Sequence, residues 1–302
     1  MNMKTTIAGV EFKNPIIAAS GTFGFGREYN EFYDVGKLGG ISSKGLTLLP
    51  RQGNPPVRIA ETPSGMLNSV GLQNPGVEYF IRNELPFMKS LGTVVIANAA
   101  GATEDDYVRI TQVLSESDVD MIELNISCPN VKKGGMAFGV EPEGVSHIVK
   151  AVRKVCKKPL IVKLTPNVSD IAKNALAAEN AGADAISLIN TITAMAVDFK
   201  TRKPVLKVVT GGLSGPAVKP IALRMVYECH KAVKIPIIGM GGIMTGKDAG
   251  EFMLCGASAV QVGTANIFDP HAALTVVNEL TNLCESDKIT DVQSLIGGLS
   301  VD

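Results

Sequence analysis

The chain has 302 residues, of which 45% are hydrophobic and 31 are glycine, and its 29 basic residues balance 29 acidic ones. This length and composition suit a globular α/β protein, and the balanced charge argues against a nucleic-acid or polyphosphate surface. The five cysteines form no C-x-x-C pair, so no metal or iron–sulfur site is expected within this chain.

The apolar runs of the sequence are well short of the roughly 18 residues that a membrane-spanning helix needs. Lys4, Glu11 and Lys13 precede a first strand near residue 15, which leaves no room for a signal peptide or a membrane-docking extension. We therefore expect a soluble, cytoplasmic protein with reduced thiols.

Residues 4–13 alternate around Ala8-Gly9, which predicts a small β-hairpin ahead of the main fold. Apolar runs that do not alternate then recur along the chain, as is typical of parallel strands covered by helices. There are eight such runs: PIIAAS (15–20), GGISSKG (39–45), TVVIANAAG (93–101), MIELNIS (121–127), PLIVKLT (159–165), DAISLINT (184–191), PIIGMGG (236–242) and SAVQVGTA (258–265).

Segments with helical signals lie between most of these runs. Thr103 and Asp106 are spaced as a capping box, and Ser169 can cap a helix that stops at Gly182. Eight β-α units predict a single domain over residues 1–302, closed as a (β/α)8 TIM barrel. An open doubly wound sheet is the alternative.

Two segments, residues 46–75 and 192–215, are too long to be simple connections. Both follow predicted strand ends, so we expect these insertions to lie over the C-terminal mouth of the barrel. The stretch KKGGMAFG (132–139) has the glycine content of a mobile lid.

The octapeptide ELNISCPN (123–130) ends an apolar strand at a proline, where the chain must turn. The turn places a lone thiol, Cys128, beside Asn125, Ser127 and Asn130. A thiol can act as nucleophile, base or metal ligand, and asparagine amides can hold a flat ring that carries N–H and C=O groups. A capped strand end with a buried cysteine would use the same residues.

The C-terminal ends of the strands of a barrel converge on one face. Lys44 and Lys163 each follow an apolar run, where an ammonium group is costly without a purpose, and together they indicate an anionic or electron-rich ligand. The predicted strand-end residues are Ser20, Lys44, Asn98, Asn125, Lys163, Asn190, Gly241-Gly242 and Gly263-Thr264.

Glycine clusters end the seventh and eighth runs, GMGG (239–242) and GTA (263–265), where barrels often hold a phosphate with backbone N–H groups. GGLSG (211–215) can add another amide. No dinucleotide or P-loop string occurs, which argues against a Rossmann dinucleotide or a P-loop nucleotide. A phosphate at this position, with strand-end polar groups and a lysine under the barrel mouth, fits flavin mononucleotide (FMN). A lysine near the flavin would stabilise its reduced ring. Pyridoxal phosphate on Lys163, or a phosphosugar, is the alternative.

Several motifs, taken in order, resemble the class 1 dihydroorotate dehydrogenases over nearly the whole chain. SGTFGFGREY (20–29) and the lack of an N-terminal extension resemble subtype B, the NAD-linked form. The matching motifs are NPIIAASGTFGFG (14–26), SSKGLT (42–47), NSVGLQNPG (68–76), ELNISCPN (123–130), VKLTPN (162–167), INT (189–191), GGLSGPA (211–217), GMGGI (239–243) and VGTA (262–265).

The resemblance implies oxidation of (S)-dihydroorotate to orotate in pyrimidine (UMP) biosynthesis, with Cys128 as the base and FMN as the hydride acceptor. The implied substrate-binding residues are Lys44, Asn68, Ser69, Val70, Gly71, Leu72, Asn125, Asn130, Asn190 and Thr191. The implied FMN-binding residues are Ser20, Lys44, Gly45, Asn98, Asn125, Lys163, Ile189, Gly215, Gly241, Gly242, Gly263 and Thr264.

The resemblance also implies a partner subunit that carries FAD and a [2Fe–2S] cluster, in a heterotetramer with two copies of each chain. This chain has neither cluster-type cysteines nor a Rossmann fingerprint of its own. The alternatives are a fumarate-linked homodimeric subtype A enzyme, the flavin domain of a dihydropyrimidine dehydrogenase, a tRNA-reducing flavin barrel and a non-catalytic flavin-binding barrel.

Overall fold

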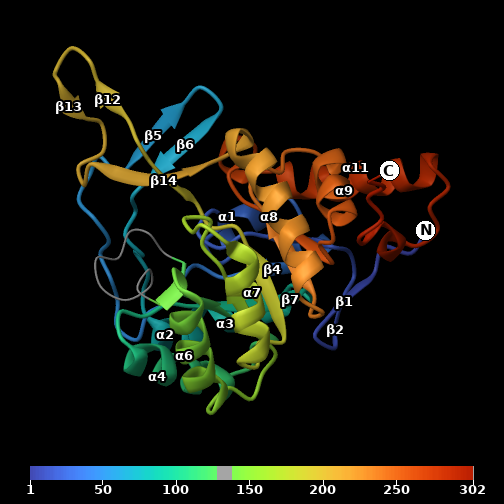
Figure 1. Cartoon of the computed structure of the whole chain (residues 1–302), viewed down its shortest axis with the longest axis horizontal. Coiled ribbons are helices and arrows are strands. Elements are labelled where there is room, and N and C mark those ends of the chain that lie inside the picture. Colours follow the sequence, from blue (N-terminus) through green and yellow to red (C-terminus); the bar gives the residue numbers. More distant parts are fainter. Residues whose placement is uncertain (128–137, 302) are drawn as a thin grey trace.

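The computed structural model describes residues 1–127 and 138–301. Its centre is a closed barrel of parallel strands in the order β10-β15-β16-β3-β4-β7-β8-β9 (Figure 1). Each strand falls within one of the eight apolar runs, so the predicted (β/α)8 TIM barrel is confirmed and the open sheet is wrong. The strands are β3 (Ile16–Ala18), β4 (Gly40–Ser42), β7 (Val94–Ala99), β8 (Met121–Asn125), β9 (Leu160–Lys163), β10 (Ala185–Leu188), β15 (Ile237–Met240) and β16 (Ala259–Val262).

The predicted N-terminal hairpin is present as β1 (Thr5–Ile7) and β2 (Val10–Phe12), which pair antiparallel. Its Ile7 and Phe12 side chains are fully buried against a layer of apolar residues from the beginnings of the barrel strands, such as Ile17, Met121 and Ile238. The hairpin therefore closes the amino-terminal end of the barrel and leaves the opposite end for a site.

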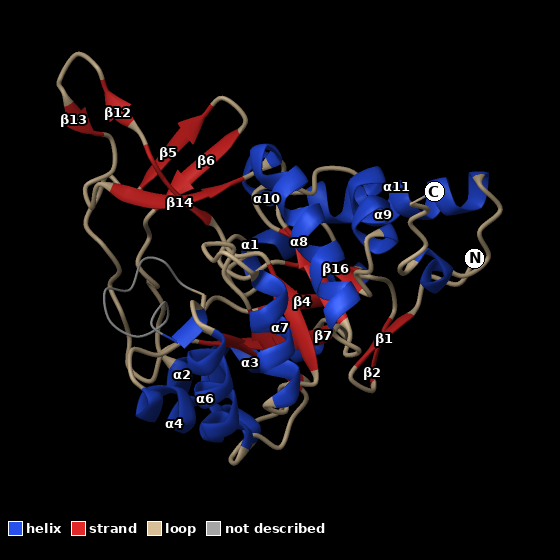
Figure 2. Ribbon diagram, in the orientation of Figure 1, coloured by secondary structure: helices blue, strands red, loops and turns tan. Residues whose placement is uncertain are grey.

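Helices follow the strands and cover the outside of the barrel (Figure 2). Among the described residues, no helix combines the length and the apolar composition that crossing a membrane requires. The helices are α1 (Arg27–Asn30), α2 (Val77–Tyr79), α3 (Leu85–Ser90), α4 (Glu104–Ser115), α6 (Pro142–Arg153), α7 (Ile171–Asn180), α8 (Lys219–Ala232), α9 (Gly246–Leu254), α10 (Ala265–Phe268) and α11 (Ala272–Ser286). The 3-10 helices are η1 (Val35–Lys37), η3 (Pro216–Val218) and η4 (Val292–Leu295), and η2 (Phe80–Glu84) is a π-helix.

The capping signals of two helices can be compared with the structure. The capping box of α4 is confirmed, because Thr103 and Asp106 each accept a hydrogen bond from the other's backbone N–H. The cap predicted at Ser169 is wrong by one residue. Asp170 caps α7 instead, since its carboxylate accepts from the Lys173 N–H at 3.2 Å. The helix ends ahead of Gly182, whose φ of +102° suits a glycine, as expected.

The two long insertions meet in one antiparallel sheet with the strand order β11-β14-β6-β5. Gly212 of β14 lies opposite Asn68 of β6, so residues far apart in sequence become neighbours. In Figure 1 this insertion sheet projects from the barrel on the side away from both termini. Its strands are β5 (Ile59–Thr62), β6 (Gly65–Asn68), β11 (Ile192–Met195) and β14 (Thr210–Ser214), with a further ribbon of β12 (Val197–Asp198) and β13 (Lys203–Pro204).

One buried tyrosine joins the end of β8 to α4. The Tyr107 hydroxyl donates to the Asn125 carbonyl oxygen at 2.9 Å, and the Tyr107 ring meets Phe138 edge-on. Asn125 is the last residue of β8, so this contact fixes the strand end that precedes the predicted Cys128 turn.

We predict that Tyr107→Phe lowers the free energy of unfolding by about 1–3 kcal/mol, because a buried carbonyl loses its donor. Urea denaturation would measure the change. The matched control is Tyr227→Phe on α8, a half-buried residue whose ring faces Lys231, where we expect a change within about 0.5 kcal/mol. Equal losses in the two variants would contradict the assigned role of the Tyr107 hydroxyl.

Candidate active site

A cavity lies at the carboxyl ends of the barrel strands, where the insertion sheet forms one of its walls. Ile59, Met66 and Leu213 reach it from the insertions, which confirms that both insertions lie over the barrel mouth. Many predicted site residues line this single cavity: Ser20, Lys44, Gly45, Asn68, Val70, Gly71, Leu72, Asn125, Lys163, Ile189, Asn190, Thr191, Gly215, Gly241, Gly242, Gly263 and Thr264.

Two predicted residues, Asn98 and Ser69, are fully buried behind the lining. Asn98 contacts Asn125, which does line the cavity, and Ser69 donates from its backbone N–H to the Arg58 carbonyl oxygen at 2.7 Å. Cys128, Asn130 and residues 132–137 of the predicted lid lie outside the described residues.

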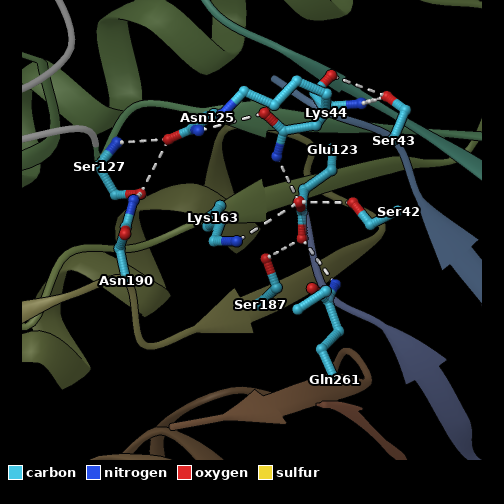
Figure 3. Close-up of polar contacts among 12 residues, drawn as sticks. Ser42, Ser43, Lys44, Glu123, Asn125, Ser127, Lys163, Ser187, Asn190 and Gln261 are labelled. Carbon is cyan, nitrogen blue, oxygen red and sulfur yellow. Dashed lines mark hydrogen bonds and ion pairs between the residues drawn. The ribbon is translucent and has the colours of Figure 1, made fainter. Parts of the chain in front are cut away.

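A fully buried carboxylate, Glu123, lies on β8 at the centre of a hydrogen-bond network beneath the cavity (Figure 3). The Lys163 Nζ lies 3.7 Å from Glu123 Oε2. The hydrogen-bond donors to this carboxylate are Asn98 Nδ2 at 2.5 Å, Ser187 Oγ at 2.8 Å, Gln261 Nε2 at 3.0 Å and Ser42 Oγ at 3.2 Å.

The network decides the charge of that carboxyl group. Burial alone would raise the pKa of Glu123, but the Lys163 ammonium and the hydrogen bonds from Ser187, Asn98 and Gln261 hold the pKa below its usual value. Glu123 is therefore a carboxylate at neutral pH, and every side chain around it must present a donor.

A chain of hydrogen bonds runs from this carboxylate to the cavity wall (Figure 3). Asn125 Nδ2 donates to Asn98 Oδ1 at 3.1 Å, and Asn125 Oδ1 accepts from the Ser127 hydroxyl at 3.0 Å. The Ser127 hydroxyl oxygen accepts in turn from Asn190 Nδ2 at 2.9 Å. The amide oxygens of Asn98 and Asn125 are thus used within the chain. Asn125 and Asn190 each keep one side-chain N–H bond that no acceptor among the described residues uses, which suits acceptor atoms of a ligand.

The rim of the cavity contains glycines in backbone conformations that residues with a side chain rarely adopt. Gly215, Gly241 and Gly242 have φ values of +99°, +126° and +78°. A Cβ on Gly242 would lie 2.8 Å from the Lys219 Cβ and 2.9 Å from the Gly215 carbonyl oxygen. Next to them, Thr264 donates to the Ser214 hydroxyl at 2.8 Å. The rim therefore offers bare backbone and hydroxyl groups, as a phosphate site requires.

The lining fits FMN in a second respect. Gln261 is 1% exposed and lines the cavity, and its Oε1 has no hydrogen-bond partner among the described residues. A buried amide oxygen of this kind needs a donor, and a flavin ring carries one at its N3 position. Lys44 and Lys163 supply cations to the same cavity. In the described part of the chain, no group of three or more His, Cys, Asp or Glu residues is placed to hold a metal ion.

The whole-chain comparisons point to one family. The model of a family described as dihydroorotate dehydrogenase matches residues 2–283. The chain belongs to the dihydroorotate dehydrogenase family. A relative from Caldicellulosiruptor saccharolyticus, named dihydroorotate dehydrogenase B (NAD(+)), catalytic subunit, is 57% identical over 301 residues and covers 100% of both chains. One of the same name from Bacteroides thetaiotaomicron is 54% identical and covers 99% of each chain.

A solved structure supports the fold. A DHODH from Eimeria tenella, crystallised with ferulenol, superposes with a TM-score of 0.82 at 24% identity, covering 98% of this chain and 88% of that one. The predicted family, its NAD-linked subtype and the oxidoreductase class are thereby confirmed by the curated relatives, and the barrel by the structure.

Sequence reasoning missed two residues of the floor, Glu123 and Gln261. The sequence carries a signal for Glu123, because a carboxylate within the apolar run MIELN is as costly to bury as the ammonium groups of Lys44 and Lys163. Gln261 sits likewise within AVQV. Alternation along these strands would have placed both side chains inside the barrel.

Proposed function

We propose that this chain binds FMN in the cavity and oxidises (S)-dihydroorotate to orotate in pyrimidine biosynthesis. One observation carries the proposal. In this chain, which matches the dihydroorotate dehydrogenase family, a single cavity is lined by Lys44, Lys163, amide N–H donors and a rim of glycines. We further propose that residues 1–302 act as a single FMN-binding domain, because residues of the barrel and of both insertions line the same cavity.

In this proposal FMN, when bound, supplies the acceptor for the hydride. The rim residues Gly215, Gly241, Gly242, Gly263 and Thr264 hold its phosphate through backbone N–H groups. The remaining residues assigned to the flavin are Ser20, Lys44, Gly45, Asn98, Asn125, Lys163 and Ile189, with Asn98 acting from behind Asn125.

Dihydroorotate carries a carboxylate and two ring carbonyl groups, so its site must be rich in donors. Lys44 and the spare N–H bonds of Asn125 and Asn190 meet this need. The segment 68–72 adds backbone groups, since Gly71 and Leu72 both have positive φ and both line the cavity. We assign the substrate to these residues together with Asn68, Ser69, Val70, Asn130 and Thr191.

We assign the base to Cys128. Its thiolate takes the proton from C5 of the substrate, and bound FMN would accept the hydride that leaves C6. A free thiol has a pKa of about 8.5, so the proposal requires a site that favours the thiolate, and we assign this role to the Lys44 ammonium at the cavity. The preceding Ser127 is hydrogen-bonded to Asn190 on the cavity wall, which supports a Cys128 position at the cavity.

We predict that Cys128→Ala keeps bound FMN but slows flavin reduction by dihydroorotate at least about a hundredfold, the range expected for loss of a general base. Anaerobic stopped-flow absorbance of the flavin would measure the rate. Cys255→Ala is the matched control, because Cys255 packs against the helical shell and does not line the cavity; its rate should stay unchanged. Unchanged kinetics in Cys128→Ala would remove the base assignment.

We predict that Gly263→Ala weakens FMN binding by about 1–3 kcal/mol, the usual effect of an extra methyl group in a filled site. The apoprotein has room for that methyl group, because its closest neighbours would be Ala19 Cβ at 3.5 Å and Thr22 Oγ1 at 3.8 Å, both on cavity-lining residues. Fluorescence titration with FMN would measure the dissociation constant.

The control for this variant is Gly250→Ala on α9, where the new Cβ would meet only Leu280 Cδ1 at 3.6 Å. It should bind FMN as the wild type does. If Gly263→Ala also binds FMN normally, the phosphate is not held at this rim.

We propose that electrons pass to NAD through a partner subunit with FAD and a [2Fe–2S] cluster, in a heterotetramer. The names of the relatives, a catalytic subunit of an NAD(+) type, support a second subunit. A cytoplasmic location is part of the same proposal, and the free thiols of Cys156, Cys229, Cys255 and Cys284 support a reducing compartment.

We predict that dihydroorotate-reduced protein is re-oxidised by NAD only when the partner subunit is present, and that fumarate re-oxidises it poorly. Anaerobic flavin absorbance with each oxidant would measure this. Rapid re-oxidation by fumarate of the chain alone would favour the subtype A alternative.

A further inference from the structure

Glu123 does not line the cavity, yet it binds two residues that do, Lys163 and Gln261. Its side chain is 0% exposed, and Lys163 is 5% exposed. A negative charge and a positive charge therefore lie together without solvent beneath the proposed flavin position. Charges so placed are weakly screened, and a ligand in the cavity experiences both of them.

The carboxylate also fixes the orientation of its amide neighbours. Because an ionised carboxylate only accepts hydrogen bonds, Asn98 and Gln261 must turn their NH₂ groups toward it. For Gln261 this leaves Oε1, which has no partner in the described part of the chain, as an acceptor on a cavity-lining residue. For Asn98 it leaves Oδ1 to accept from Asn125, which sets the direction of the hydrogen-bond chain toward Asn190.

We propose that Glu123 is a positioning residue, which holds the Lys163 ammonium beneath the flavin, orients the Gln261 amide toward it and so sets the reduction potential of the bound FMN. The proposal rests on FMN binding in the cavity. Reduction adds negative charge to the flavin. Lys163 favours that charge, and the Glu123 carboxylate beside Lys163 offsets part of its effect. Removing the Glu123 charge therefore makes the bound flavin easier to reduce.

Glu123→Gln is the sharpest test because it keeps the shape of the side chain. Its amide oxygen can still accept from Asn98 and Ser42 on the Lys163 side. Its NH₂ group then replaces Oε1, which forces Gln261 to turn. We expect the variant to remain yellow and its affinity ratio for reduced over oxidised FMN to rise at least about tenfold. For a two-electron couple that corresponds to about +30 mV.

The matched control is Ser187→Ala, which removes one neutral donor to the same carboxylate and leaves the charge in place. In this control, the ratio of the affinities for reduced and oxidised FMN should change by less than twofold. Anaerobic titration against reference dyes, at the same neutral pH for every variant, would measure all the potentials. An unchanged or more negative potential in Glu123→Gln, relative to Ser187→Ala, would overturn the proposal. If the wild-type protein binds no FMN, the proposed function itself fails.

A second comparison covers the case in which Glu123→Gln does not fold. Lys163→Met leaves the carboxylate without its cation, and the double variant with Glu123→Gln removes that uncompensated charge as well. If the pairing is as proposed, the double variant unfolds at a higher temperature than Lys163→Met alone. A lower unfolding temperature of the double variant would overturn the pairing.

Discussion

A carboxylate that has no access to water needs a donor on every side, and the barrel is built around this requirement at Glu123. The donors come from five other strands: Ser42 on β4, Asn98 on β7, Lys163 on β9, Ser187 on β10 and Gln261 on β16. Each hydrogen bond holds only if its strand keeps its register relative to β8. The interaction that orders the floor of the cavity thus also constrains how the barrel closes.

The wall of the cavity depends on a different constraint, the pairing of two insertions that are more than a hundred residues apart in sequence. The β6-β14 ladder brings Asn68 next to Gly212. This pairing fixes the end of β6, where the predicted substrate segment begins, relative to the glycines that precede Gly215. A cavity with a barrel floor and a sheet wall can hold a planar cofactor below and a second planar molecule above it.

The barrel could be predicted from the sequence because each strand is a short apolar run that ends in a polar residue or glycine. Lys44 and Lys163 could be located for the same reason, since strand ends meet at one face. Other features depend on tertiary contacts that no local pattern encodes. These are the pairing of β14 with β6, the choice of Asp170 over Ser169 as a cap, and the burial of Asn98 and Ser69 behind the lining.

The hairpin that carries Ile7 and Phe12 closes the barrel at its amino-terminal end. The cavity therefore lies at the opposite end, and reactant and product reach it and leave it from the carboxyl ends of the strands. A molecule bound at that end of the barrel would cover whatever the cavity holds.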